Sequence, residues 1–289
     1  MFPKVPDYHK PNNPLVSNGL GIVYVLISAT YLFLLYFFAT EGTNAPSDVS
    51  PALTLAVCIL FGGFMGLIDD WMDLRWRYKA FFPLIAAIPL IALASRLELR
   101  TSIAFPLLGT LPFGVYYYFI IIPLIVTVTT NTVNQLGGLN GLETVCPAII
   151  LVGLMLISGS NATLLYVPLA VWLLLAIFNF RGKIFVGNTG SFAIGITLAA
   201  FAIISDVKSS LLISILPYVF NSALILLTYF FSKTKAHVTF DGQKLASDHR
   251  RSLITLVTYR RPMTERKVVV IIALLMAAST LAALLFEWL

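Results

Sequence analysis

Charged residues are scarce in this sequence. Asp, Glu, Lys and Arg make up 11% of its 289 residues and hydrophobic residues make up 58%, whereas ordinary soluble domains carry roughly 25% charged residues. Apolar stretches recur along the whole chain, and each approaches the ~20 residues that a helix needs to cross a bilayer. This composition leaves little room for a soluble domain and predicts an integral membrane protein.

Further absences narrow the class of protein. The two cysteines, Cys58 and Cys146, have apolar neighbours and no CxxC or Cys/His spacing, so we interpret them as packing residues. Ionisable residues are almost absent within the apolar stretches, which argues against an ion or proton pathway. Residues 1–14 are polar and proline-rich and lack the apolar region of a signal peptide, so we expect the first apolar stretch to direct insertion.

Stretches of this length fit helices rather than barrel strands, because backbone amides in hydrocarbon must bond within their own segment and barrel strands are about 10 residues long. We predict an all-α fold that forms one integral membrane domain over residues 1–289, with a long cytoplasmic loop at residues 232–267. The nine predicted spans cover residues 18–38, 50–68, 80–95, 113–131, 142–158, 163–180, 189–204, 210–231 and 268–287.

Lysine and arginine are distributed unevenly between the two sides of these spans. With the N-terminus inside, 16 of the 19 basic residues lie in inside segments, as the positive-inside rule predicts. We therefore expect a cytoplasmic N-terminus. The topology and the attraction of anionic lipid headgroups already explain the net charge of +6. We therefore expect these basic residues to contact the lipid bilayer and not a nucleic acid.

Polar residues gather at three inside helix ends. The first cluster, within residues 62–83, contains Asp69, Asp70 and Lys79. Carboxylates beside cations can form an interfacial salt-bridge knot. They can also form a site that offers a base or a metal ligand together with cations for phosphate. The pattern alone leaves both interpretations open.

The second cluster, TNTVNQLGGLNGLE, covers residues 130–143. Asn140 and Glu143 are spaced i, i+3, so they can share one face of a helix. Between the two helices, Gly137 and Gly138 let backbone amides approach a ligand closely. The alternative interpretation is an ordinary turn that is rich in glycine and asparagine.

The third cluster, FNFRGKIFVGNTGSF at residues 178–192, joins Arg181 and Lys183 to a turn that contains Asn188. This turn precedes a predicted helix, and the free amides of a helix N-terminus bind anions. Because the charge distribution independently places all three clusters on one face, we predict that together they form a single site at the cytoplasmic side.

These clusters resemble motifs of the polyprenyl-phosphate N-acetylhexosamine-1-phosphate transferases, most closely those of dolichyl-phosphate GlcNAc-1-phosphotransferases from eukaryotes. Four stretches in the same order carry the resemblance: GFMGLIDDWMDLRWRYK, TNTVNQLGGLNGLE, KIFVGNTGSF and PMTERKVVVIIALL. The resemblance implies transfer of GlcNAc-1-phosphate from UDP-GlcNAc to dolichyl phosphate, with release of UMP and with Mg²⁺ or Mn²⁺ as cofactor. In so short a chain it suggests an archaeal enzyme of the cell membrane that begins N-glycan assembly.

The resemblance also implies a metal site and catalytic groups. Asn134 matches a metal-binding asparagine, and Asn188 replaces the family's usual aspartate ligand, which removes a negative charge and should weaken Mg²⁺ binding. Asp69 and Asp70 match the acidic pair needed for activity. The pair acts either as a base for the lipid phosphate or as groups that orient the metal and Lys79, which matches a lysine near the diphosphate.

The predicted substrate contacts fall into two groups. Those for the nucleotide and its phosphates are Gly137, Gly138, Asn140, Glu143, Arg181 and Lys183. Those for the sugar-facing loop are Lys233, Lys235 and His237, although plain positive-inside charge explains them equally well. His9 and His249 are expected to be solvated loop residues.

Two alternatives stay open. A transferase of the same fold can use another UDP-sugar or undecaprenyl phosphate, and a relative that lost catalysis with Asn188 can serve as a membrane scaffold or transporter. A transporter should show internal repeats or broken helices at mid-membrane, and neither is visible. Members of the family usually have ten spans, so this protein either has nine or begins upstream of residue 1, and a homodimer is compatible with the sequence.

Overall fold

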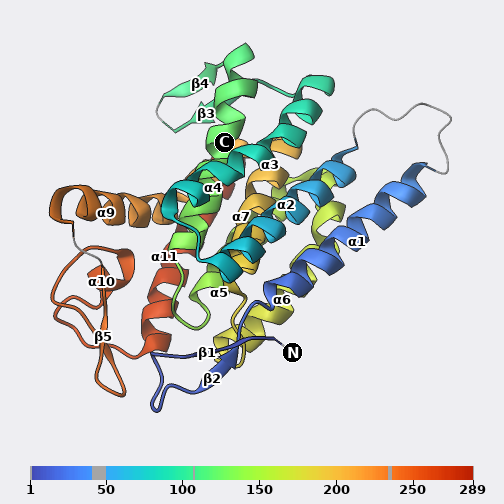
Figure 1. The fold of residues 1–289 in the computed structure, drawn as a ribbon. Helices are drawn as coiled ribbons and strands as arrows, with labels where there is room; N and C mark the ends of the chain where they lie inside the picture. The colour runs from blue at the N-terminus through green and yellow to red at the C-terminus, as the bar shows by residue number, and fades with distance from the viewer. Residues whose placement is uncertain (1, 41–49, 107, 234–235, 289) are drawn as a thin grey trace.

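The computed structural model describes residues 2–40, 50–106, 108–233 and 236–288, and the fold within these ranges is mostly helical (Figure 1). The prediction of an all-α, polytopic membrane fold is confirmed. The helical segments are α1 (Gly21–Thr40), α2 (Pro51–Met72), α3 (Trp76–Arg96), η1 (Tyr117–Ile121), α4 (Ile122–Gln135), α5 (Leu142–Ile157), η2 (Gly159–Leu165), α6 (Tyr166–Phe180), α7 (Gly187–Ile204), α8 (Lys208–Ser214), α9 (Leu216–Ser232), α10 (Leu253–Val257) and α11 (Glu265–Trp288).

Three short antiparallel hairpins, which the sequence did not predict, join these helices. They are β1–β2 (Lys4–Pro6 with Leu15–Ser17), β3–β4 (Ser102–Phe105 with Gly109–Pro112) and β5–β6 (Thr239–Phe240 with Leu245–Ala246). The hairpin β3–β4 lies at one end of the helix bundle, and β1–β2 and β5–β6 lie toward the other end (Figure 1).

The described residues contain fewer qualifying spans than the nine predicted. Seven helices are long and apolar enough to cross a membrane, and an eighth results if α8 and α9, which are bent by 54° relative to each other, form one span. The predicted span at residues 142–158 is α5, whose 16 residues extend about 24 Å, less than the ~30 Å of a hydrocarbon layer. By length and composition alone, the described residues thus contain seven or eight candidate spans and one shorter apolar helix, α5.

Helix α7 lies at the centre of the bundle and packs against α2 and α4 (Figure 1). Of its residues, 89% are buried, as expected of a helix that is apolar on all sides. Glycine lets α2 approach it closely, because a Cβ at Gly66 would lie 2.2 Å from the carbonyl oxygen of Asn188. This close packing sets the acidic end of α2 against the first turn of α7.

The bend between α8 and α9 has a local cause. Pro217, the second residue of α9, lacks the N–H that would bond the Ile213 carbonyl in a continuous helix. The hydroxyl of Ser279, in α11, donates to that carbonyl instead at 2.6 Å. Helix α9 therefore points away from the direction of the bundle (Figure 1).

The segment between α9 and α11, predicted as a loop, contains β5–β6 and α10. Ser252 and Thr255 form a capping box at the start of α10, which satisfies amides that a helix N-terminus otherwise leaves free. The amide of Leu253 donates to Asn221 Oδ1 at 2.8 Å. The segment is therefore anchored to α9 rather than lying free.

Candidate active site

The carboxylate of Asp70 caps the N-terminus of α7. Its Oδ1 accepts a hydrogen bond from the backbone amide of Asn188 at 2.8 Å. Its Oδ2 accepts hydrogen bonds from the backbone amide of Thr189 at 2.9 Å and from the Thr189 hydroxyl at 2.7 Å. A negative charge is stabilised at this end of a helix, where the backbone dipole is positive and amides lack partners. Residues from the first and third predicted clusters, 118 positions apart in the chain, are thereby joined.

Asp69 points to different partners, because successive residues of a helix lie about 100° apart. Its Oδ1 lies 2.9 Å from the ammonium of Lys79 and accepts the Leu74 amide at 3.0 Å. Its other carboxylate oxygen is buried and has no hydrogen-bond partner among the described residues. The acidic pair therefore divides its tasks, with Asp70 bound to α7 and Asp69 paired with a cation from α3.

Ser191 connects the predicted metal ligands. Its hydroxyl donates to Asn134 Oδ1 at 2.6 Å, and the same hydroxyl lies 3.3 Å from the backbone oxygen of Asn188. The C-terminal end of α4 and the N-terminal turn of α7 thus meet at one hydroxyl group. The sequence did not single out Ser191, although it belongs to the third cluster.

Gly137 and Gly138 occupy the turn between α4 and α5. A Cβ at Gly137 would lie 3.3 Å from Glu143 Oε2, so this glycine leaves room for the carboxylate. Gly138 has a φ of +92° and open space around it, a conformation that glycine adopts without strain. The backbone of this turn is therefore accessible to a ligand.

Asn140 belongs to a buried polar knot instead of facing a cavity. Its backbone amide and side-chain amide both donate to Glu265 Oε1, at 2.7 and 2.9 Å, and the side-chain amide also donates to Asp7 Oδ2 at 2.7 Å. Lys10 pairs with the other oxygen of Glu265 at 2.9 Å. The knot ties the first hairpin and the start of α11 to the turn between α4 and α5.

Two adjoining cavities, which we call the crevice, open beside these groups. The first, of about 360 Å³, is lined by predicted residues Asp70, Gly138, Glu143 and Asn188 and by His9. The second, of about 330 Å³, shares Gly138 and His9 with the first and adds Gly137 and His237. The long segment after α9 therefore reaches the same crevice as the three predicted clusters.

The N-terminal segment contributes crevice residues that sequence reasoning missed. Asp7, Tyr8, His9 and Asn18 line the first cavity. None of the three predicted clusters includes them, and only the packing of the first hairpin against the turn between α4 and α5 brings them to the cavity.

Several predicted site residues do not line the crevice. Asp69, Lys79, Asn134 and Asn140 lie outside its lining, as do Arg181, Lys183 and Lys233. The last three are exposed, and Lys233 ends α9 in a left-handed conformation. Lys235 lies outside the described residues. The expectation that His249 is solvated is wrong, because its side chain is only 10% exposed.

The helices that carry Asp70, Asn134, Glu143 and Asn188 all fall within residues 51–206, and this range matches the description Glycosyl transferase family 4. The chain belongs to this family. The family assignment agrees with a multi-pass membrane enzyme whose polar clusters share one end of the bundle.

Relatives of this family 4 chain come from three groups of organisms. A Saccharolobus solfataricus protein, provisionally named a UDP-N-acetylglucosamine–dolichyl-phosphate N-acetylglucosaminephosphotransferase, is 32% identical over 92% of this chain and 82% of its own length. The Schizosaccharomyces pombe enzyme of that name is 26% identical over 75% of this chain and 59% of its own length. A phospho-N-acetylmuramoyl-pentapeptide-transferase of Prochlorococcus marinus is 28% identical over 82% of this chain and 66% of its own length.

Proposed function

We propose that this family 4 transferase moves GlcNAc-1-phosphate from UDP-GlcNAc to dolichyl phosphate or a related polyprenyl phosphate, releasing UMP, as the first step of assembling a lipid-linked N-glycan precursor. The observation that carries the proposal is the crevice, which gathers Asp70, Glu143, Asn188 and the Gly137–Gly138 backbone at one end of a membrane helix bundle. The names of the archaeal and yeast relatives support this substrate pair. We place the crevice at the cytoplasmic face, where the basic residues concentrate.

An apolar cavity of about 460 Å³ between α4, the α8–α9 bend and β3 suits the chain of the acceptor lipid. Its lining includes Ile121 of η1 and follows α4 from Leu124 to Thr129. Asn134 lies five residues beyond Thr129, or about 7.5 Å along a helix. A polyprenyl chain in this cavity would hold its phosphate near the C-terminal end of α4, beside the crevice.

The crevice suits the sugar nucleotide. The open backbone at Gly137 and Gly138 and the carboxylate of Glu143 would contact the uridine end, and His237 would contact the diphosphate or the sugar from the second cavity. The exposed Arg181, Lys183 and Lys233 would attract both anionic substrates through long-range charge. Asn140 would act indirectly, by holding the turn that carries the two glycines.

Mg²⁺, or Mn²⁺, fits the oxygen donors in this region. Asn134 and Asn188 offer amide oxygens, and Asp69 has one buried carboxylate oxygen without a partner among the described residues. Oxygen is the ligand atom that both ions prefer. The Asp70 carboxylate lies 2.8 Å from the backbone amide nitrogen of Asn188. It therefore supplies a negative charge beside residue 188, where the family usually has an aspartate. When bound, the ion would neutralise charge on the diphosphate.

In the reaction, an oxygen of the lipid phosphate attacks the β-phosphorus of UDP-GlcNAc, the bond to the bridging oxygen breaks, and UMP leaves. A phosphate monoester has its second pKa near 6, so the acceptor already carries a nucleophilic oxygen at neutral pH. This favours an orienting role for Asp69 and Asp70 over a role as base. Lys79, fixed by Asp69, would add positive charge near the reacting phosphates.

UMP release by the detergent-purified protein tests the proposal. The assay compares dolichyl with undecaprenyl phosphate, and UDP-GlcNAc with other UDP-sugars, because the bacterial relative leaves both choices open. We expect metal-dependent release that requires the lipid and falls at least 100-fold in Asp69→Asn. Asp73→Asn is the matched control, since Asp73 is fully exposed and lies 4.0 Å from the same lysine. Absence of release with every lipid and UDP-sugar would contradict the proposal.

A further inference from the structure

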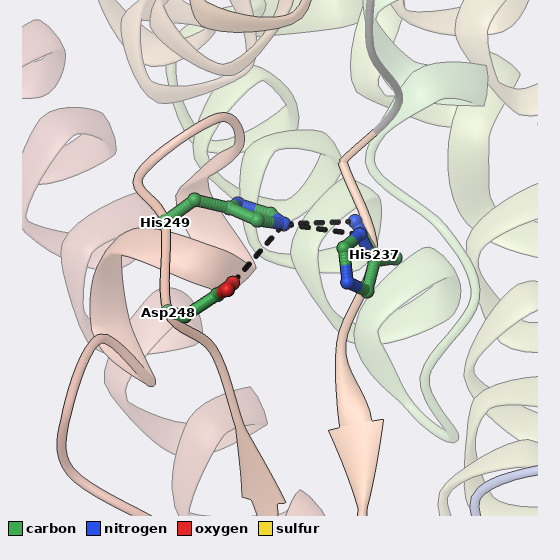
Figure 2. A group of neighbouring side chains, drawn as sticks. All are labelled: His237, Asp248 and His249. Carbon is green, nitrogen blue, oxygen red and sulfur yellow. Dashed lines mark hydrogen bonds and ion pairs between the residues drawn. The ribbon is translucent and has the colours of Figure 1, made fainter.

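The base of the β5–β6 hairpin brings together two of the three histidines of the chain. The hairpin pairs Thr239 with Ala246, and extending this register by two residues on each strand sets His237 opposite Asp248. His249 follows directly. Figure 2 shows the three side chains converging from the two strands.

The distances among these side chains match a metal site. His237 Nδ1 and His249 Nε2 lie 3.3 Å apart, and ligand atoms from all three residues lie within 4.8 Å of one another. Two nitrogens that each bind zinc at about 2.0–2.1 Å with tetrahedral geometry lie about 3.3–3.4 Å apart. The Asp248 carboxylate is 4.0 Å from His249 Nε2, and because its side chain is 87% exposed it can rotate to close that gap.

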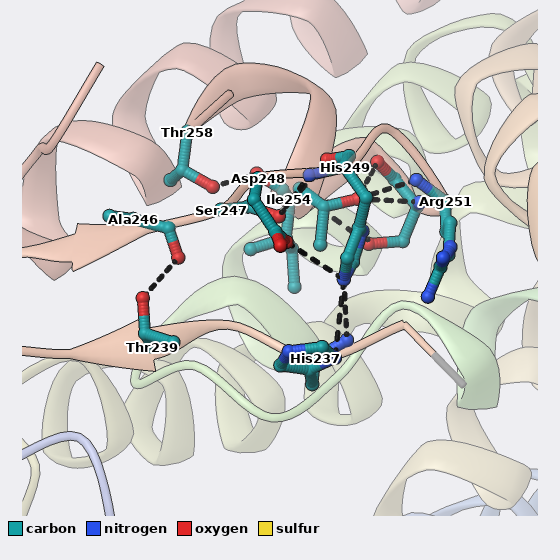
Figure 3. Close-up of polar contacts among 11 residues, drawn as sticks. His237, Thr239, Ala246, Ser247, Asp248, His249, Arg251, Ile254 and Thr258 are labelled. Atoms are coloured by element: carbon teal, nitrogen blue, oxygen red, sulfur yellow. Dashed lines mark hydrogen bonds and ion pairs between the residues drawn. The ribbon is translucent and has the colours of Figure 1, made fainter. Parts of the chain in front are cut away.

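The surrounding structure holds His249 in place. The Ser247 hydroxyl accepts the His249 amide at 3.2 Å and donates to the His249 carbonyl at 3.0 Å. The amide of Ser247 in turn donates to the Thr258 carbonyl at 3.3 Å. Figure 3 shows this network around the two imidazoles. The backbone amide of His237 donates to His249 Nε2 at 3.4 Å, so the lone pair of this nitrogen faces the other histidine.

We propose that His237, Asp248 and His249 bind a divalent transition-metal ion of the zinc class. Imidazole nitrogen suits such ions, whereas the oxygen donors near Asn134 and Asn188 suit Mg²⁺ or Mn²⁺. The two sites are therefore chemically distinct. Three protein ligands leave a fourth position for water, as in open zinc sites.

The ion would clamp the two strands of the hairpin at their base. His237 lines the second cavity of the crevice, so the clamp would fix the side of the crevice that the long segment supplies. On the far side of this segment, the bond from Leu253 to Asn221 already anchors the chain. The metal would add a second anchor, at the base of the β5–β6 hairpin.

Metal titration of protein purified without a histidine tag tests this proposal. The protein is stripped with a chelator and titrated with Zn²⁺, followed by elemental analysis, and with Co²⁺, whose visible absorption reports tetrahedral coordination. We expect one equivalent of Zn²⁺ and a tetrahedral Co²⁺ spectrum for the wild type. Affinity should fall at least tenfold in His237→Ala and in His249→Ala, and should stay unchanged in His9→Ala, the matched control.

Thermal unfolding shows whether each variant folds. Zn²⁺ should raise the Tm of the wild type and of His9→Ala but not of His249→Ala. Asp248→Asn alters an exposed side chain that the fold does not need, and it should still weaken Zn²⁺ binding. Wild-type protein that binds no Zn²⁺, or equal loss in His9→Ala and His249→Ala, would overturn the site. Neither measurement depends on transferase activity, so the outcome is separate from the proposed function.

Discussion

At the scale of single residues, Asn188 stands where the motif resemblance predicts an aspartate that binds the metal. An amide oxygen coordinates Mg²⁺ without contributing negative charge, and charge count is a main determinant of the affinity of such sites. The nearby Asp70 carboxylate would offset part of this loss in the proposed metal site, but it already accepts three hydrogen bonds.

We therefore predict that Asn188→Asp lowers the Mg²⁺ concentration for half-maximal UMP release by roughly an order of magnitude. The measurement is the Mg²⁺ dependence of the initial rate. Asn161→Asp, which makes the same change in η2, is the control and should leave the dependence unaltered. An unchanged Mg²⁺ dependence in Asn188→Asp would show that this residue is not a metal ligand.

Asp70 has a structural task that is separable from any catalytic one. Asp70→Ala removes three hydrogen bonds from the first turn of α7, and we expect a loss of about 1–3 kcal/mol in the free energy of unfolding. Thermal unfolding in detergent measures it. Asp73→Ala, on an exposed carboxylate of the same stretch, should change stability by less than about 0.5 kcal/mol. Equal stability of the two variants would mean that the cap contributes nothing.

At the scale of elements, the bend between α8 and α9 shapes the apolar cavity. Ile213, Ile215 and Leu216 surround the bend and line that cavity. Pro217 prevents a continuous helix, and the bond from Ser279 satisfies the carbonyl that the proline leaves without its helical partner. The direction of α9 therefore depends on one missing N–H.

Pro217→Ala should let α8 and α9 join and should distort the cavity. We expect the KM for the polyprenyl phosphate to rise about tenfold, while the KM for UDP-GlcNAc changes by less than about twofold, because the crevice lies elsewhere. Steady-state kinetics with each substrate varied in turn measures both. Pro89→Ala, in α3 and outside the cavity lining, is the control. A parallel rise in both KM values would instead indicate a general loss of folded protein.

At the scale of the whole molecule, the polar clusters, the crevice and the start of α11 share one end of the bundle, and β3–β4 lies at the other (Figure 1). The basic residues predict that the crevice end is cytoplasmic. Both native cysteines, Cys58 and Cys146, are buried, so new surface cysteines can report sidedness against a silent background.

We predict that a membrane-impermeant maleimide labels Asp73→Cys only in inside-out vesicles and Leu108→Cys only in right-side-out vesicles. Asp73 follows α2 at the crevice end and Leu108 lies in the β3–β4 turn, and both side chains are exposed. The unmodified protein is the control and should not react. The opposite labelling pattern would place the crevice outside the cell and refute the predicted topology.

The sequence by itself determined the membrane class and the helical fold, and it predicted one site at one end of the bundle. Hydrophobic length and the distribution of charge are properties of local segments, so they can be read along the chain. The motifs likewise placed Asp70, Asn188, Gly138 and Glu143 in one site, and the structure brings all four to one cavity. Length was a less decisive signal, because α5 has only 16 residues and falls below the length of a candidate span although its sequence is apolar.

Only the tertiary structure decided which hydrogen-bond partners the predicted site residues have. Asn140 bonds Asp7 and Glu265, which are 133 and 125 positions away, and no local pattern encodes such partners. The same holds for the pairing of His237 with His249, which depends on the register of a two-residue hairpin. Hydrogen bonds of this kind form between segments that packing brings together, so their partners are determined by the fold and not by spacing along the chain.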